Sequence, residues 1–158
     1  MTKIISFSAV SVFGLLFTMI SYAKKTETPM KPSNPDVRRV TAKEADDLLK
    51  GGAVMVDVRK KIEFSEEHIK GAIHVPYKEK KKFSAKSETF DMSKDKFPHE
   101  KLPSDKKLVF YCNGPTCWKS FKAVVWTLKN RPELKQNLWW LRGGIPEWKQ
   151  SKLATSLN

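Results

Sequence analysis

The sequence is poor in the residues that build disulfide frameworks and metal centres. Its 158 residues include only two cysteines and three histidines. Two cysteines cannot staple a disulfide-dense scaffold, and so few histidines leave little material for a zinc site. We therefore expect no metal centre, and any cysteine chemistry has to be local.

Acidic residues are also in the minority. The chain has 30 Lys and Arg against 17 Asp and Glu, which gives a formal charge of +13. A high positive charge is compatible with nucleic-acid binding, but no helix-turn-helix or RNA-reading motif is present, so nucleic acid is not an expected partner. Hydrophobic residues make up 40% of the chain, which is enough to fill the core of one globular domain.

A long apolar stretch without charges is found at the N-terminus. Residues 4–20 follow the basic Lys3, and residues 21–23 place small side chains at the two positions that a signal peptidase inspects. This pattern predicts a signal peptide over residues 1–23 and a periplasmic or otherwise exported protein. The alternative is a retained anchor, because the stretch is close to the minimum length of a membrane span, and only then would the protein contact a membrane.

The rest of the chain divides into three parts. Residues 24–37 contain three prolines and no apolar periodicity, which is typical of a linker. Residues 38–153 hold the periodic segments and form the predicted domain. Residues 154–158 are expected to be a C-terminal tail.

Short apolar runs alternate with helical patterns along this domain. Thr41 and Glu44 have the spacing of a capping box, and Gly51 can end the helix that they begin. This alternation predicts an α/β fold, with an open parallel sheet covered by helices on both faces. The expected strands are 53–56, 72–75, 108–111 and 138–141, and the further expected helices are 62–70, a segment including 121–128, and a last helix near Pro146.

Reactive chemistry is expected in the loop after the strand at 108–111. In an open parallel sheet, ligands bind beyond the carboxyl ends of the strands, and this loop leads directly into a helix N-terminus. Backbone N–H groups and the helix dipole favour an anion there, so the Cys112 thiol is expected to ionise more readily than a free thiol. The alternative is that Cys112 is a small buried packing residue.

Five motifs in order resemble a single-domain rhodanese over about residues 38 to 152. They are Val54-Met55-Val56-Asp57-Val58-Arg59, Glu63-Phe64, His68-Ile69-Lys70-Gly71-Ala72-Ile73-His74-Val75-Pro76, the Tyr111-Cys112 loop, and Leu141-Arg142-Gly143-Gly144-Ile145-Pro146-Glu147-Trp148. The resemblance implies a rhodanese-like open parallel sheet of about five strands.

This resemblance also implies a function. Cys112 would take sulfane sulfur from a small anionic donor, thiosulfate or polysulfide, hold it as a persulfide and pass it to a thiol or other thiophilic acceptor, without a metal or organic cofactor. Asp57, Arg59 and His68 match family positions that support the fold. The substrate-binding loop would consist of Asn113, Gly114, Pro115, Thr116, Cys117 and Trp118.

The loop departs from the family pattern in ways that favour weak thiosulfate turnover. Many active loops have arginine after the cysteine, where this chain has Asn113, and Pro115 lacks an N–H donor. Lys119 and the helix terminus are left to attract the anion. The alternative function is a non-turnover sulfur carrier or binding module that serves a periplasmic partner protein. A phosphatase with a C-x5-R loop is excluded, because Trp118 occupies the position of its arginine.

The loop contains a second cysteine, Cys117, five residues after Cys112. It could be a resolving thiol that attacks a persulfide on Cys112, which would leave a disulfide for a reductant to reopen, or it could pack as a structural neighbour. The sequence does not decide whether the two cysteines form a disulfide. With Cys112 as the carrier, Cys112→Ser is expected to abolish persulfide formation and Cys117→Ser to spare it.

Overall fold

The computed structural model describes residues 26–80 and 90–157 of the chain. The predicted signal peptide, residues 1–23, lies outside this described part. Among the residues described, no helix combines the length and apolar character needed to cross a bilayer.

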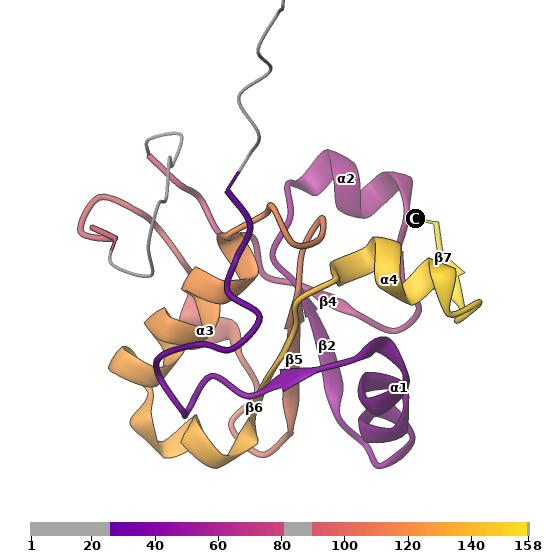
Figure 1. The fold of residues 1–158 in the computed structure, drawn as a ribbon, viewed down its shortest axis with the longest axis horizontal. Coiled ribbons are helices and arrows are strands. Elements are labelled where there is room, and N and C mark those ends of the chain that lie inside the picture. The colour runs from indigo at the N-terminus through magenta and orange to yellow at the C-terminus, as the bar shows by residue number, and fades with distance from the viewer. Residues whose placement is uncertain (1–25, 81–89, 158) are drawn as a thin grey trace, which may run out of the picture.

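A five-stranded parallel sheet lies at the centre of the molecule (Figure 1), which confirms the predicted α/β fold. Its strands follow the order β1-β6-β5-β2-β4. They are β1 (Arg39–Val40), β2 (Val54–Asp57), β4 (Ile73–His74), β5 (Leu108–Tyr111) and β6 (Leu138–Leu141). Because β5 is the middle strand, the loop that follows it emerges at the centre of the sheet's carboxyl edge.

Helices cover both faces of the sheet, as predicted (Figure 1). The α3 helix (Lys119–Asn130) packs on one face, and α1 (Ala42–Lys50) and α4 (Gly144–Gln150) pack on the other. The remaining helical elements are α2 (Lys61–Glu66) and the 3-10 helices η1 (His99–Lys101) and η2 (Pro132–Asn137).

The two faces bury alternate residues of the central strand. Leu108 and Phe110 of β5 belong to the cluster that includes Phe121 of α3, whereas Val109 and Tyr111 belong to the cluster formed with α1 and α4. All four β5 residues are fully buried. Successive side chains of a strand point to opposite faces, so an unbroken apolar run is what a strand covered on both sides requires.

The capping box predicted for the first helix is confirmed. The Thr41 backbone N–H donates to Glu44 Oε2 at 2.7 Å, and the Glu44 N–H donates to Thr41 Oγ1 at 3.3 Å. The helix ends at Lys50, and the N–H of the cap residue Gly51 donates to the Asp47 carbonyl. The hydrogen bonds of the first turn therefore define where α1 begins.

Three segments differ from the sequence prediction. The helix expected over 62–70 ends at Glu66, because His68–Ile69 form strand β3. The partner of β3 is β7 (Thr155–Ser156), an antiparallel strand within the expected tail 154–158. In the expected linker 24–37, the described residues 26–37 contact the domain, since Thr28 and Val37 are buried. A pair of two-residue strands is too short to produce a recognisable pattern, and the same holds for β1.

Candidate active site

Residues 112–118 connect the end of β5 to the start of α3, where the sequence places the candidate site. Asn113 and Thr116 are exposed, Pro115 and Cys117 are half-buried, and the others in this loop are buried. The loop turns back on itself through a hydrogen bond from the Cys117 N–H to the Gly114 carbonyl at 2.9 Å. Gly114 has a φ of 107°, a backbone conformation that suits glycine.

The turn after β6 supports the start of this loop. The Ile145 N–H donates to the Cys112 carbonyl at 3.0 Å. A Cβ atom on Gly144 would lie only 2.1 Å from that carbonyl oxygen, so the two backbones approach too closely for any side chain at this position. The Gly143-Gly144 pair seen in the sequence thus fixes where the Cys112 backbone lies.

Cys112 is completely buried beneath the loop. Its Sγ lies 3.0 Å from the Cys117 carbonyl oxygen, to which the thiol donates, and 3.0 Å from Ser120 Oγ. Burial raises the pKa of the Cys112 thiol well above its ordinary value, and the hydrogen bond and charge of Cys117 act in the same direction. The expectation that Cys112 ionises more readily than a free thiol is therefore wrong, because its sulfur has too little compensation for the lost solvent.

Cys117 is half-buried and has the surroundings that were expected for Cys112. The neighbouring Cys112 side chain, together with the backbone N–H groups of Asn113 and Lys119 and the Lys119 charge, outweighs burial and lowers the pKa of Cys117 to about 7. Both cysteines are free. The amide groups at the start of α3 thus favour negative charge on the second sulfur of the loop.

The segment 26–28 lies across the loop. Thr28 donates twice to the Pro115 carbonyl, from its backbone N–H and from Oγ1, each at 2.8 Å. The indole Nε1 of Trp118 donates to the Thr26 carbonyl at 3.1 Å. The guanidinium of Arg142, at the end of β6, donates to the Thr28 carbonyl at 2.7 and 3.0 Å. These contacts join the N-terminal segment to the middle of the loop, to its last residue and to the residue that follows β6.

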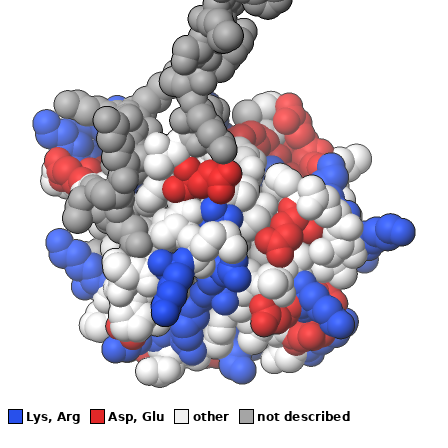
Figure 2. All heavy atoms as spheres, in the orientation of Figure 1, with Lys and Arg blue, Asp and Glu red and all other residues white. Residues whose placement is uncertain are grey.

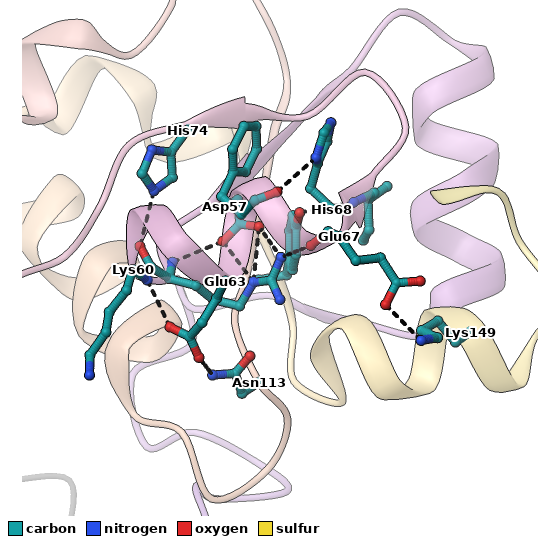
Figure 3. A network of polar contacts seen from close by, with 12 residues as sticks. Asp57, Lys60, Glu63, Glu67, His68, His74, Asn113 and Lys149 are labelled. Carbon is teal, nitrogen blue, oxygen red and sulfur yellow. Dashed lines mark hydrogen bonds and ion pairs between the residues drawn. The ribbon is translucent and has the colours of Figure 1, made fainter. Parts of the chain in front are cut away.

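Asn113 is held by the helix on the other side of the loop (Figure 3). Its side-chain amide donates to Glu63 Oε1, and Glu63 Oε2 accepts from the Lys60 backbone N–H at 2.9 Å. Burial opposes ionisation of Glu63, but these hydrogen bonds and the charges of Lys119 and Arg59 prevail and lower its pKa. Glu63 is therefore a fixed carboxylate next to the loop.

The predicted support residues form a network at the end of β2 (Figure 3). Arg59 donates from Nη2 to Asp57 Oδ2 at 2.7 Å and to the Glu67 carbonyl at 2.5 Å, and Asp57 is fully buried. The His68 ring stacks on Phe64 with centroids 4.1 Å apart, and its Nδ1 lies 3.0 Å from the Phe64 carbonyl oxygen. These contacts join β2, α2 and β3.

Sequence reasoning assigned no role to Ser120 or Arg142. Ser120 is fully buried, and its Oγ accepts from Trp140 Nε1 at 3.0 Å. It precedes Val124 by one helical turn, so a polar residue on the buried face was a usable signal. Arg142 gave no such signal, because its partners lie in the proline-containing segment before the domain.

In residues 26–80 and 90–157, no three His, Cys, Asp or Glu side chains are grouped so that they could hold a metal ion.

The sequence profile of the Rhodanese-like domain matches residues 41–151, so the chain belongs to the rhodanese-like domain family. No curated protein sequence matches this chain.

Solved structures share the fold at low sequence identity. The BH2092 protein from Bacillus halodurans is 22% identical, with a TM-score of 0.52 over 76% of this chain and 77% of its own. A rhodanese-related protein from Thermoplasma volcanium is 19% identical, with a TM-score of 0.51 over 77% of this chain and 99% of its own. A thiosulfate sulfurtransferase from Pseudomonas aeruginosa is 18% identical, with a TM-score of 0.53 over 77% of this chain but only 20% of its own.

Proposed function

We propose that this protein is a sulfurtransferase that moves sulfane sulfur through a persulfide on a cysteine of the 112–118 loop. Its place in the rhodanese-like domain family supports this class of chemistry. The observation that carries the proposal is the pair of free thiols, Cys112 and Cys117, after the central strand, one of them with a lowered pKa. The thiolate is the form that attacks sulfur, so the loop offers a nucleophile near neutral pH.

The expected donor is thiosulfate or a polysulfide. The thiolate attacks the outer sulfur of thiosulfate, a new S–S bond forms, and sulfite leaves with the electron pair of the broken bond. A thiol or another thiophilic acceptor then removes the outer sulfur and restores the thiolate. The cycle needs no metal and no organic cofactor, and the family resemblance assigns the persulfide to Cys112.

Lys119 is the proposed source of attraction for the donor. It is the first residue of α3, and its charge contributes to the lowered pKa of Cys117. Figure 2 shows Lys and Arg side chains interspersed with Asp and Glu over the face seen in Figure 1, so local groups rather than one uniform field surround the molecule there. The effect of Lys119 should therefore act at short range.

The second candidate function is a sulfur carrier or binding module that serves a periplasmic protein partner without turning over free donor. It is favoured by the complete burial of Cys112 and by the segment 26–28, which lies over the loop. Both features limit the access of a soluble acceptor. A partner protein that displaced this segment would then be needed for sulfur to leave.

The two functions are separated by an assay of thiosulfate and cyanide on the purified, reduced protein. Multiple turnovers, with thiocyanate formed in large excess over protein, support the sulfurtransferase. Loading of one sulfur per chain without turnover supports the carrier. Failure of both cysteines to take up sulfur from thiosulfate and from polysulfide would contradict sulfur chemistry at this loop.

Export is a further part of the proposal. The N-terminal pattern of residues 1–23 supports removal of a signal peptide and a periplasmic location. N-terminal sequencing of the protein from its native source is expected to begin at Lys24. A protein that retains Met1 and fractionates with the membrane would support the anchor instead.

A further inference from the structure

We propose that residues 26–28 form an autoinhibitory strap, which holds the 112–118 loop closed over Cys112 and has to be released before the loop can exchange sulfur. This inference rests on the proposed function, because it concerns access to the same loop. The strap lies outside residues 41–151, which the family profile matches, so it is an addition to the matched domain.

Thr28 is the residue that fastens the strap. Its backbone N–H and its Oγ1 both donate to the Pro115 carbonyl at 2.8 Å, and its own carbonyl accepts from Arg142 at 2.7 and 3.0 Å. Only 2% of its surface is exposed, although the strap is neither helix nor strand. The polar backbone groups of such a segment are usually solvated. At Thr28 they are bonded to the loop and to Arg142 instead.

The strap is bonded to the loop at two points. Pro115, in the middle of the loop, accepts from Thr28, and Trp118, its last residue, donates from Nε1 to the Thr26 carbonyl at 3.1 Å. In Figure 1 the N-terminal part of the described chain (indigo) runs beside the loop that leads into α3. The loop therefore cannot lift away from the domain without breaking its bonds to the strap.

The fastened part of the loop covers the sulfur of Cys112. This sulfur is completely buried, and the carbonyl that accepts its thiol hydrogen belongs to Cys117, which lies between the two fastened points along the chain. Reaction at the sulfur requires a donor atom within about 3–3.5 Å of it. The loop has to move to admit that atom, and the strap opposes the movement.

The ion pair at the strap is weaker than the bonds of Thr28. Arg142 Nη2 lies 2.9 Å from Glu27 Oε2, but 52% of the Glu27 side chain is exposed. Water and salt screen such a carboxylate, so the pair adds little to the closed state. The two bonds from Thr28 to the Pro115 carbonyl should therefore decide how often the strap opens.

The central test removes these two bonds. Thr28→Pro lacks both the backbone N–H and the hydroxyl, and it lies outside the matched domain, so the domain should still fold. The reduced protein is treated with iodoacetamide at one fixed pH, and fragment mass spectra give the rate of alkylation at each cysteine. We expect Cys112 to react about tenfold faster than in the original protein, because the lost bonds raise the population of the open state.

Two further variants are the controls. Thr26 is exposed and contacts Trp118 only through its backbone carbonyl, which Thr26→Val keeps, so this variant should react at the original rate. Glu27→Gln removes the half-exposed charge and should change the Cys112 rate by less than about threefold. A tenfold increase in Thr26→Val as well would overturn the assignment of Thr28 as the fastener.

Local release of the strap has to be distinguished from unfolding of the whole domain. Hydrogen exchange of the peptide that contains β5 measures the latter, because all four β5 residues are fully buried. We expect this exchange to be unchanged in Thr28→Pro. Exchange that accelerated as much as Cys112 alkylation would overturn the strap.

Sulfur loading separates this inference from the proposed function. With thiosulfate or polysulfide, Thr28→Pro is expected to load sulfur on the loop about tenfold faster than the original protein. Unchanged Cys112 alkylation, or faster alkylation with unchanged loading, would overturn the autoinhibitory strap and leave sulfur transfer intact. Faster alkylation without sulfur uptake in either protein would instead contradict the proposed function and leave the closed loop intact.

Discussion

The ends of the neighbouring strands β2 and β5 each bury an acidic side chain, but the groups around the two side chains differ. β2 ends at Asp57, which is paired in register with Tyr111 of β5, so the residues that follow the two strands start side by side. At the end of β2, the buried carboxylate of Asp57 is bonded by the Arg59 guanidinium at 2.7 and 3.0 Å. At the end of β5, the buried sulfur of Cys112 has a carbonyl and a hydroxyl as its neighbours.

This difference shows that the partners of a buried group decide its charge. A cation and several donors stabilise the carboxylate at one strand end, whereas the thiol at the other is held neutral and its pKa is raised. Negative charge in the loop is instead favoured five residues later, at Cys117, where backbone amide groups help to lower the pKa of the thiol. Adjacent strand ends thus differ in the groups that surround their buried acidic side chains: Arg59 pairs with Asp57, whereas Cys112 has no cation beside it.

The largest predicted effect comes from removing the cation at the end of β2. Arg59→Met leaves the fully buried Asp57 without its partner, and we expect the free energy of unfolding to fall by about 3–5 kcal/mol. Urea denaturation followed by tryptophan fluorescence measures this loss. The matched control is Lys149→Met, which removes a solvent-exposed partner of Glu67 and should cost less than about 1 kcal/mol. Equal losses in the two variants would mean that the buried pair has no special role.

The next effect concerns the backbone at the end of β5. A Cβ on Gly144 would press against the Cys112 carbonyl at 2.1 Å, and φ is 59°, so Gly144→Ala should cost about 2–4 kcal/mol. Gly52→Ala is the control, because Gly52 also has a positive φ but nothing lies within 4 Å of the added Cβ. It should cost only about 1–2 kcal/mol. If both variants lost the same stability by urea denaturation, close packing beneath Cys112 would be disproved.

A smaller effect is expected for the segment that lies over the loop. Thr28→Val removes the hydroxyl that donates to the Pro115 carbonyl but keeps the backbone N–H bond and the side-chain shape. The free energy of unfolding should fall by about 0.5–1.5 kcal/mol. Thr26→Val, the same change at an exposed position of the segment, is the comparison for general effects on the segment. A Thr28→Val protein as stable as the original would show that this contact does not fasten the segment.

The smallest effect concerns electrostatics at Cys117. Because the pKa of Cys117 is lowered, its thiolate fraction rises as the pH increases through about 7. Lys119→Gln removes one favourable charge, so the midpoint of Cys117 alkylation should move upward by a few tenths of a pH unit. High salt should reduce the difference between the two proteins, since it screens a partly exposed charge. A downward shift would contradict the assigned direction of the Lys119 effect.

The sequence predicted those parts of the fold that depend on local pattern. The runs 108–111 and 138–141 form β5 and β6, and the Thr41 capping box begins α1. Burial on both faces produces an unbroken apolar run, and a cap produces a recognisable residue spacing. The strands β3 and β7 show neither pattern in the sequence. Their pairing joins residues far apart in the chain, and two residues are too few to show a period.

The structure confirms that the candidate loop lies after an apolar strand and before a helix. Which of its sulfurs has the lowered pKa could not be read from that place, because it depends on the direction of individual groups. The Cys112 thiol donates to the Cys117 carbonyl, and the backbone amides of Asn113 and Lys119 act to lower the pKa of Cys117. The contacts that Thr28 and Trp118 make across the loop could not be predicted either, because they involve the segment 26–28, which has no periodic pattern.

The most direct test of sulfur transfer at this loop is the position of the added sulfur in the unmodified protein. Reduced protein is incubated with thiosulfate, freed of excess donor, alkylated at once and fragmented in the mass spectrometer. We predict that the additional sulfur atom is found on Cys112, the cysteine to which the family resemblance assigns the persulfide. Sulfur on Cys117 alone would contradict the assignment of the nucleophile, and sulfur on neither residue would contradict sulfur transfer itself.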